Sequence, residues 1–568
     1  MIQKGVTNTT MYWRITKFDL GKGEEEMKLK RIVSAGLAGT MALSMVACGG
    51  SKTSDSADEN VKSTEPVVAE NTANADEANT EKTDETLVVA LASEPSSIVA
   101  TLVGESENES SIIGGSILDT LVAQDQKTGE VIPNLATEWE WLDDYRLQFK
   151  LRDDVKSYDG DLLTAQDVVY TFETLAAQSG NNDGGKFLDP SKNEVVDDHT
   201  VILGFNTIAP DLVTMLTWTP FGIFSQDEVE ACGDFETAAD KPLFGTGKYH
   251  FKEWVQGQYI TLERNEDYWN PDYAGYFKEI KFTFTQDAAS REMAVEAGDA
   301  GVAYDISVAQ ASTYVSNPNV KTSFYSFGQT MHLWMNMRDS EPLKDVKVRE
   351  AIDKALDYDA IAAYQTGGQG KQALGYIDSN VPFAVESYTT EERKQDIEAA
   401  KALLEEAGYT NLTLKALGAQ DTEGLYTVIQ AQLAQVGITL EISTVDIPTF
   451  VQGANGGDYD LIIVGEYLDS RNPSAYVFFD SNSINTFCIG GPKWTSDEIE
   501  SAIKDVIQAK DNEEAKEKVA ALEEIFKKDT LVINLCPEMK AVITQTDIKG
   551  LTTRERGFID ATNFYRTK

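Results

Sequence analysis

A basic segment, an apolar segment and a cysteine follow one another between residues 27 and 48, and they constrain this chain most. Met27 is followed by Lys-Leu-Lys-Arg, then by the mainly apolar residues 32–47, then by Cys48. This order is typical of a secretory signal peptide. The apolar run is short for a membrane span, and no later stretch approaches the roughly 20 apolar residues that a span needs. We therefore expect residues 27–47 to be removed and the remainder to fold outside the cytoplasm.

The residues before Cys48 resemble the lipobox of bacterial lipoproteins. The segment reads Met45-Val-Ala-Cys48, with methionine where leucine is usual. The resemblance implies that Cys48 carries a lipid, becomes the first mature residue and anchors the protein on the outer face of the cell membrane. The alternative is an ordinary secretory signal with a chance cysteine.

Residues 1–26 do not fit a signal peptide, because an acidic segment precedes Met27. We expect translation to start at Met27.

Residues 48–85 are predicted to form a disordered acidic tether. They are rich in Ser, Thr, Asn, Ala, Asp and Glu and contain no aromatic residue. Such a composition cannot bury enough apolar surface to fold. A flexible chain of this length has a root-mean-square reach of roughly 30 to 35 Å. The folded body would therefore stand above the membrane without entering it.

Length, charge and cysteine content limit the remaining possibilities. A chain of 568 residues exceeds one compact core, so more than one lobe is expected. Asp and Glu number 93 against 49 Lys and Arg, a net charge of −44 that disfavours nucleic acid as a partner. Once Cys48 is lipidated, Cys232, Cys488 and Cys536 remain, which allow at most one internal disulfide. We expect buried free thiols.

Local patterns predict an α/β fold. Thr86–Leu91 is a continuous apolar run typical of a buried strand. Thr164 and Asp167 form a capping signature that opens a helix, and a second helix is predicted over Thr389–Gly408 from its own capping box. Further along, a predicted helix at residues 425–436 is followed by two predicted strands at residues 438–442 and 460–465. This order favours a parallel or mixed sheet.

A series of segments resembles the extracellular solute-binding proteins of family 5, which include dipeptide-, oligopeptide- and nickel-binding proteins. The segments occur in the family's order and extend over most of residues 86–568. They are Ile117-Leu-Asp-Thr-Leu-Val, Val131-Ile-Pro-Asn-Leu-Ala-Thr-Glu-Trp-Glu, Leu147-Gln-Phe-Lys-Leu-Arg-Asp-Asp-Val, Asp159-Gly-Asp-Leu-Leu-Thr-Ala-Gln-Asp-Val, Phe244-Gly-Thr-Gly-Lys-Tyr, Leu262-Glu-Arg-Asn-Glu-Asp-Tyr-Trp, Val346-Lys-Val-Arg-Glu-Ala-Ile-Asp-Lys-Ala-Leu-Asp, Ala400-Lys-Ala-Leu-Leu-Glu-Glu-Ala-Gly-Tyr and Gln430-Ala-Gln-Leu-Ala-Gln-Val-Gly-Ile.

The resemblance implies a two-lobed clamp with the α/β fold of periplasmic binding proteins. Within that fold it implies type II proteins, in the cluster of large members that have an extended first lobe. It places the first lobe at residues 86–325 plus 540–568 and the second lobe at residues 326–539. A ligand would lie between the lobes, and closure would follow as a population shift. A monomer that binds without turnover and without a cofactor is expected.

The same resemblance implies the receptor of an ABC importer, which captures peptides and delivers them to membrane permease subunits. Three alternatives remain open at this point. The same clamp could bind a nickel chelate or another small solute, it could signal without transport, or the chain could be a secreted carboxylate-based hydrolase.

The candidate ligand site is the segment from Tyr459 to Pro473. A predicted buried strand ends at Gly465, and ligands of open α/β sheets lie beyond the carboxyl ends of strands. In peptide-binding relatives an acidic residue in this turn accepts the peptide's α-ammonium, and Asp469 holds that position. Gly465 and Tyr467 are candidates for backbone pairing with the ligand.

Two departures from the family pattern affect this site. Glu466 stands where tryptophan is frequent, which affects the neighbouring side-chain pocket. Dipeptide binders of the family hold the ligand carboxylate with an arginine, and the segment starting at Asp421 contains no arginine. Three explanations remain open: the ligand is longer than a dipeptide, Arg471 or another basic residue replaces that arginine, or the ligand is not a peptide.

Other motifs favour structural roles. Gly245-Thr-Gly-Lys248 lacks the upstream glycine and the following Ser or Thr of a phosphate-binding loop, so a structural turn is expected. Asp159 and Asp161 lack the full register of a calcium loop, so a helix entry or solvated turn is expected. The three histidines show no metal-ligand spacing, and we expect no metal site: His199, His250 and His332.

Overall fold

The structure is a computed structural model that describes ten stretches of the chain. The signal peptide, Cys48 and most of the predicted tether lie outside them, as do residues 1–26. All described residues belong to one of the two compact units of the chain, Glu65–Lys568. Within the described stretches, no helix is long and apolar enough to cross a membrane. The stretches are residues 82–103, 108–125, 129–178, 183–208, 211–239, 241–337, 340–419, 422–466, 497–554 and 557–567.

The described residues form a mixed α/β fold around a ten-stranded sheet, as the sequence predicted. Across this sheet the strands are, in spatial order, β14 (Ile438–Val445), β13 (Leu412–Ala419), β15 (Leu461–Glu466), β12 (Val320–Met335), β16 (Val532–Gln545), β11 (Val302–Ile306), β1 (Thr86–Leu91), β10 (Glu279–Phe284), β9 (Tyr259–Arg264) and β8 (Tyr249–Val255).

Smaller sheets accompany the large one. A four-stranded sheet has the order β4 (Ala136–Asp143), β5 (Arg146–Leu151), β7 (Thr200–Gly204) and β6 (Glu194–Asp197). Two pairs complete the described strands: β2 (Val122–Gln124) with β3 (Val131–Pro133), and β17 (Ile548–Lys549) with β18 (Tyr565–Arg566).

The described α-helices mostly lie between these strands in the sequence. Before β12 they are α1 (Ala100–Val103), α2 (Asn108–Ile117), α3 (Ala165–Ala177), α4 (Leu212–Met215), α5 (Gln226–Cys232), α6 (Phe235–Ala239), α7 (Ala288–Ala297) and α8 (Val308–Ala311). After β12 they are α9 (Val346–Ala355), α10 (Tyr358–Gln365), α11 (Ile397–Glu406), α12 (Glu423–Ala434), α13 (Ile447–Gly456), α14 (Asp497–Ile507) and α15 (Asn512–Asp529).

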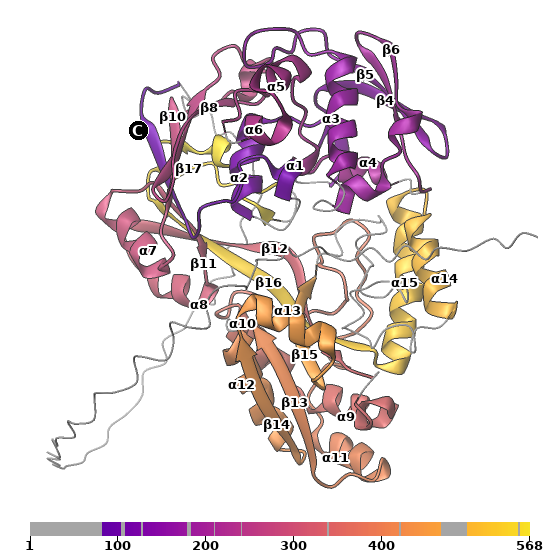
Figure 1. Cartoon of the computed structure of the whole chain (residues 1–568). Coiled ribbons are helices and arrows are strands. Elements are labelled where there is room, and N and C mark those ends of the chain that lie inside the picture. The colour runs from indigo at the N-terminus through magenta and orange to yellow at the C-terminus, as the bar shows by residue number, and fades with distance from the viewer. Residues whose placement is uncertain are drawn as a thin grey trace, which may run out of the picture. The chain divides into compact units, whose positions relative to one another are not determined.

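Two long antiparallel strands, β12 and β16, run side by side through the middle of the large sheet (Figure 1). On one side of this pair β16 joins β11, which is parallel to β1. On the other side β12 joins β15, which is parallel to β13. The predicted helix at residues 425–436 and the predicted strands at 438–442 and 460–465 correspond to α12, β14 and β15. Strand β13, which the sequence did not predict, is parallel to β14 and is joined to it by the crossover helix α12.

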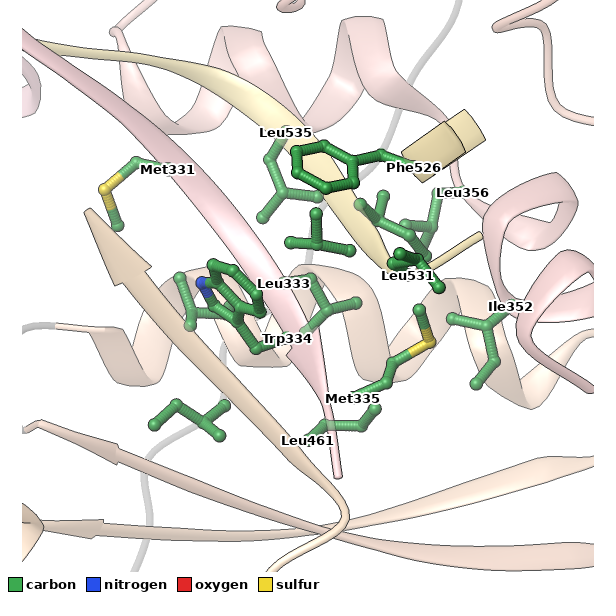
Figure 2. Packing of buried hydrophobic residues seen from close by; sticks show 14 of the residues in the cluster. Met331, Leu333, Trp334, Met335, Ile352, Leu356, Leu461, Phe526, Leu531 and Leu535 are labelled. Carbon is green, nitrogen blue, oxygen red and sulfur yellow. The ribbon is translucent and has the colours of Figure 1, made fainter. Parts of the chain in front are cut away.

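The core around the second half of β12 is built from that strand, the end of α15 and the start of β16. Figure 2 shows Leu333, Trp334 and Met335 of β12 with Phe526 of α15 and Leu531 beside them. This cluster draws only on residues 331–536, whereas a second cluster draws on residues 87–325 and 542–564. Each large side chain buried in these clusters contributes about 1.5–3 kcal/mol to folding.

The Gly245–Lys248 motif is a structural turn, as predicted. A Cβ on Gly247 would lie 2.5 Å from the carbonyl carbon of Ile117, so only glycine fits against α2. Lys248 Nζ donates to Thr562 Oγ1 at 3.0 Å and Asn563 Oδ1 at 2.9 Å. The lysine therefore holds the C-terminal segment against this turn, a role unlike that of a phosphate-loop lysine.

The loop with Asp159 and Asp161 is a hydrogen-bonded turn. Asp159 Oδ1 accepts from the backbone N–H of Asp161 at 3.2 Å and from Ser157 Oγ at 3.0 Å. The backbone N–H of Asp159 in turn donates to Glu228 at 2.7 Å. These contacts use the carboxylate of Asp159 within the turn, in agreement with the predicted structural role.

The predicted start of the helix over Thr389–Gly408 was wrong. The capping box exists, since the backbone N–H of Thr389 donates to Glu392 at 2.8 Å, but it closes only a turn. Helix α11 begins at Ile397, where Asp396 caps the N–H of Ala399. Between the two caps the Arg393 guanidinium is buried over the rings of Tyr358 and Tyr388. Burying that cation bends the chain away from a continuous helix.

The capping signature at Thr164 was correct. Asp167 accepts from both the backbone N–H and the hydroxyl of Thr164, at 2.8 and 2.9 Å, and α3 begins at Ala165.

The expectation that the cysteines are buried free thiols holds in part. Cys232 and Cys536 are free thiols and Cys536 is buried, but Cys232 is exposed at the end of α5. Cys488 lies outside the described residues.

Candidate functional site: the carboxyl end of strand β15

Strand β15 ends at Glu466, so the structure describes two of the predicted ligand-binding residues, Gly465 and Glu466. The other three, Tyr467, Asp469 and Arg471, lie outside the described residues, as does the predicted lipidation site. Six consecutive residues of β15 pair with β12 without a register shift, and Gly465 lies opposite Met331. The backbone at Gly465 is therefore fixed by a regular antiparallel ladder on its β12 side.

On its other side, β15 separates from β13 after Ile462. The parallel pairing covers only Ala416 with Leu461 and Leu417 with Ile462. The hydroxyl of Tyr426, from helix α12, lies between the strands at this point. It accepts from the N–H of Ile463 at 2.7 Å and donates to the carbonyl of Leu417 at 2.7 Å.

This separation leaves Gly465 at an open ladder position. Along a strand, residues two apart direct their backbone N–H and C=O groups to the same side. Since Ile463 directs its N–H toward Tyr426, Gly465 directs its own N–H and C=O toward the same side of β15. In the described part of the chain, no strand pairs with Gly465 there. An extended backbone could occupy that position.

The α-carbon of Gly465 is approached closely by side chains from β12 and β16. A Cβ there would lie 2.3 Å from Gln329 Oε1, 3.0 Å from Glu538 Oε2 and 3.1 Å from the Met331 sulfur. Any larger residue would displace at least the amide of Gln329. The glycine thus lets polar groups of the neighbouring strands reach the edge of β15.

Glu538 belongs to an ion cluster with Lys540 and Asp305. Lys540 Nζ lies 3.1 Å from Glu538 Oε1 and 3.4 Å from Asp305 Oδ1. Burial disfavours the lysine's charge, but the attraction of Glu538 and Asp305 outweighs burial and raises the pKa of Lys540. With one ammonium and two carboxylates, the cluster carries an excess negative charge. The side chains of Lys540 and Asp305 are 26% and 35% exposed, so the cluster is partly accessible.

Asp305 adopts an unusual backbone conformation. Its φ of 55° is left-handed, a region that non-glycine residues rarely enter, and the β11–β16 register shifts between Ala303 and Ile306. Such strain costs of order 1–3 kcal/mol and is concentrated at functional sites. The irregularity turns the carboxylate of Asp305 toward Lys540.

Sequence reasoning missed the ion cluster. One signal was available, because Glu538 and Lys540 are two residues apart in an otherwise apolar segment and must share one face of a strand. Asp305 offered no comparable signal, since its approach to Lys540 depends on the pairing of β11 with β16.

The side chain of Glu466 turns into the protein interior. Its Oε2 lies 3.3 Å from Nδ1 of His332 on β12, and both side chains are almost fully buried. Burial raises the pKa of Glu466, and the neighbouring His332 opposes this rise. Glu466, expected from the family resemblance at a position where tryptophan is frequent, is thus part of a buried polar contact.

A separate cavity of about 440 Å³ lies where residues 382–383 and the start of α15 approach β3, β4 and α4. Trp139 and Trp141 provide aromatic walls, and Phe383 adds a third ring. Asp211 and Asp511 also line the cavity, where Asp211 Oδ1 accepts from Thr214 Oγ1 at 2.7 Å and Asp511 Oδ1 from the N–H of Glu514 at 2.9 Å. Aromatic faces together with carboxylates suit a cationic group with an apolar stem.

Metal ligation has no support in the described residues. They contain no group of three or more His, Cys, Asp or Glu side chains arranged to hold an ion. The histidines are apart from one another, His332 against Glu466 and His250 against the ring of Tyr158.

Comparison with known proteins identifies the family. The family model of bacterial extracellular solute-binding proteins, family 5, middle part, matches residues 130–486, more than half of the chain. The chain belongs to this family. It is therefore an extracellular solute-binding protein, and the alternative of a secreted hydrolase is not supported.

Individual members show how far the similarity extends. The family 5 protein described here is 25% identical over 404 residues to the di/tripeptide-binding protein 1 of Pseudomonas aeruginosa, a match that covers 64% of this chain and 73% of that one. It is 26% identical over 324 residues to the nickel-binding protein NikA of Staphylococcus aureus, covering 56% and 62%. Peptide and nickel binders thus both occur among its relatives.

A solved structure confirms the predicted fold class. The periplasmic binding protein DppA of Helicobacter pylori, in complex with the peptide STSA, superposes with a TM-score of 0.69 at 22% identity. The match covers 86% of this chain and 99% of that one. The α/β fold of periplasmic binding proteins is therefore shared.

Proposed function

We propose that this family 5 protein captures peptides for an ABC importer and delivers them to the permease subunits in the membrane. The observation that carries the proposal is the open ladder position at Gly465. A peptide could pair its main chain there as an added strand. Main-chain hydrogen bonds are independent of side chains, so such a site suits a receptor for peptides of varied sequence.

The charge near Gly465 supports the same ligand class. The excess negative charge of the Asp305–Lys540–Glu538 cluster favours a ligand ammonium over a carboxylate. We infer that Asp469 accepts the α-ammonium, that Tyr467 joins Gly465 in backbone pairing, and that Arg471 is a candidate partner for the ligand carboxylate. A buried ammonium needs a charged acceptor to offset its lost hydration.

The relatives support peptides over other solutes. One is named a di/tripeptide-binding protein, and the superposed structure holds a peptide. Because one relative is named a nickel-binding protein, a nickel chelate remains the alternative ligand. The described residues contain no group of side chains arranged to hold a metal ion.

We further propose two lobes, residues 86–325 with 540–568 and residues 326–539, that close over the ligand as a monomer. The two separate core clusters are consistent with this division. The strands β12 and β16 would then serve as the connection about which the lobes move.

Identifying the bound solute tests the peptide proposal directly. Native mass spectrometry of protein purified without denaturation should show an added mass that releases short peptides on unfolding. Calorimetry with those peptides should give one site per chain. Recovery of a nickel chelate, or of one non-peptide solute at full occupancy, would contradict the proposal.

Anchoring through Cys48 is a separate proposal, based on the segment that resembles a lipobox. Cells expressing the wild type should incorporate labelled palmitate into the protein, and Cys48→Ser should abolish incorporation. Cys232→Ser is the matched control, because Cys232 is an exposed thiol far along the chain. Equal labelling of Cys48→Ser and wild type would exclude the lipid anchor.

A further inference from the structure

The cavity of about 440 Å³ beside β4 is lined by residues of both proposed lobes. Residues 124–141 and 211–214 belong to the stretch proposed as the first lobe, and residues 382–383 and 511–512 to the second. The volume lies within the range of about 300–1,000 Å³ that is typical of small-molecule sites. The cavity is separate from the site at Gly465, because no described residue of β12, β15 or β16 lines it.

Direct packing beside the cavity holds its two sides together. A Cβ on Gly129 would lie 2.5 Å from Pro382 Cγ, so the turn before β3 approaches Pro382 as closely as glycine allows. Gln124 Nε2 donates to the Gly129 carbonyl at 3.1 Å and fixes this turn. Ile507 of α14 packs against the core cluster of residues 331–536 and against a third cluster drawn from residues 121–223. The cavity is therefore a gap within a packed contact.

Aromatic rings wall the cavity from both sides. Trp139 and Trp141 are two residues apart on β4, so their side chains lie on the same face of that strand. Both pack against the cluster of residues 121–223, and Trp141 lies on Phe205 with ring centroids 5.6 Å apart. Phe383 is buried in the cluster of residues 331–536. Each ring is thus held in place by its own core.

The lining carries negative charge. Its charged residues are Glu130, Asp211 and Asp511, and no Lys, Arg or His of the described chain is among the lining residues. Asp211 is buried, whereas Glu130 and Asp511 are exposed, so solvent and salt screen the charge of Asp211 least. This field attracts a cation and disfavours an anion.

Polar groups of the lining are hydrogen-bonded within their own segments. Thr214 Oγ1 donates to Asp211 Oδ1 at 2.7 Å, and the N–H of Glu514 donates to Asp511 Oδ1 at 2.9 Å. Such a lining favours a cation that donates no hydrogen bond and is held by charge and by ring faces. A methylated ammonium has these properties, and aromatic faces attract it.

We propose that this cavity is a second ligand site, which binds a methylated ammonium cation of about the size of choline. The cation would lie against the rings of Trp139, Trp141 and Phe383, within the field of the carboxylates. Because the walls come from both proposed lobes, a bound cation favours the arrangement in which the two sides are together. The site does not depend on which solute binds near Gly465.

The first experiment observes the cavity by fluorine NMR of protein labelled with fluorotryptophan. The chain has 8 tryptophans, and the variants Trp139→Phe and Trp141→Phe assign the two signals of interest. Choline should shift both signals saturably. Dimethylbutanol, its neutral isostere with a tert-butyl group, should bind about 2- to 30-fold more weakly, the range of a cation–ring attraction. Equal affinity for the two compounds, or choline binding that leaves both signals unchanged, would overturn the proposal.

The second experiment tests whether the cation is held from both sides. Glu130→Gln on the first-lobe side and Asp511→Asn on the second keep the side-chain size, and asparagine still caps α15. Each variant should weaken choline binding by about 2- to 5-fold, as expected for a partly exposed charge. Full affinity in either variant would refute a site shared by both lobes.

The matched control for these variants is Glu140→Gln. Glu140 is an exposed carboxylate between the two tryptophans on β4, and its side chain lies on the opposite face of that strand. Its neutralisation changes the net charge as Glu130→Gln does, but it should leave choline affinity and both tryptophan signals as in wild type. An equal loss in Glu140→Gln and Glu130→Gln would show that only the overall charge matters, and would overturn the site.

Discussion

At the scale of single residues, one hydroxyl bridges β15 and β13 where the two strands separate before Gly465. Tyr426 is fully buried, and its hydroxyl satisfies backbone groups of both Ile463 and Leu417. Tyr426→Phe leaves both groups without this partner, and each buried unsatisfied group costs about 1–3 kcal/mol. We expect the free energy of unfolding, measured in urea, to fall by an amount in this range or above. Tyr273→Phe, at a 66% exposed tyrosine, should leave it unchanged.

The role proposed for Asp469 gives a second prediction at this scale, although Asp469 lies outside the described residues. Removing one partner of a buried charge pair typically costs about 2–5 kcal/mol, or roughly 30- to 4,000-fold in affinity. Asp469→Ala should weaken peptide binding by that factor, and N-acetylation of the peptide should weaken binding to wild type comparably. Calorimetry on the four combinations should show little further loss when both changes are combined. Additive losses would place the ammonium elsewhere.

At the scale of elements, helix α15 carries a buried carboxyl that makes stability depend on pH. Burial raises the pKa of Glu523 to about 8, although Ser387 Oγ donates to it at 2.5 Å and the N–H of Tyr376 at 3.3 Å. The folded protein therefore holds this proton more tightly than the unfolded chain does. The resulting stability is fully present below about pH 4.5 and is lost as the pH rises toward 8.

Glu523→Gln removes that dependence, because an amide keeps an acceptor but does not titrate. The free energy of unfolding of the wild type should decline above pH 5 with an added slope of up to about 1.4 kcal/mol per pH unit, and the variant should lack this component. Chemical unfolding at pH 5, 7 and 9 measures both. Glu524→Gln changes the exposed neighbour on α15 and should behave as wild type. Parallel pH profiles for Glu523→Gln and wild type would contradict a protonated Glu523.

At the scale of the whole molecule, the proposed closure predicts a change of dimensions without a change of secondary structure. Hinge motion moves lobes as bodies, and a ligand shifts the population only as far as it binds the closed state more tightly. Small-angle scattering should show a smaller radius of gyration with saturating peptide, while far-ultraviolet circular dichroism stays constant. An unchanged radius would argue against closure.

The sequence by itself determined the local elements and the family. The apolar run at Thr86–Leu91, the cap at Thr164, and the helix at residues 425–436 with the strands at 438–442 and 460–465 each reflect contacts between near neighbours, and each was found where expected. The start of α11 was misjudged because burial of Arg393, a tertiary contact, overrides a good local cap.

The contacts at the candidate site were decided by the tertiary structure alone. Glu466 meets His332, Tyr426 meets Ile463, and Asp305 meets Lys540 only because particular strands are neighbours in a particular register. A shift of one residue in a strand would turn each side chain to the opposite face. The residues are distant in sequence, and no local pattern contains that register. Packing of whole strands and helices sets it, and so sets which polar groups surround Gly465.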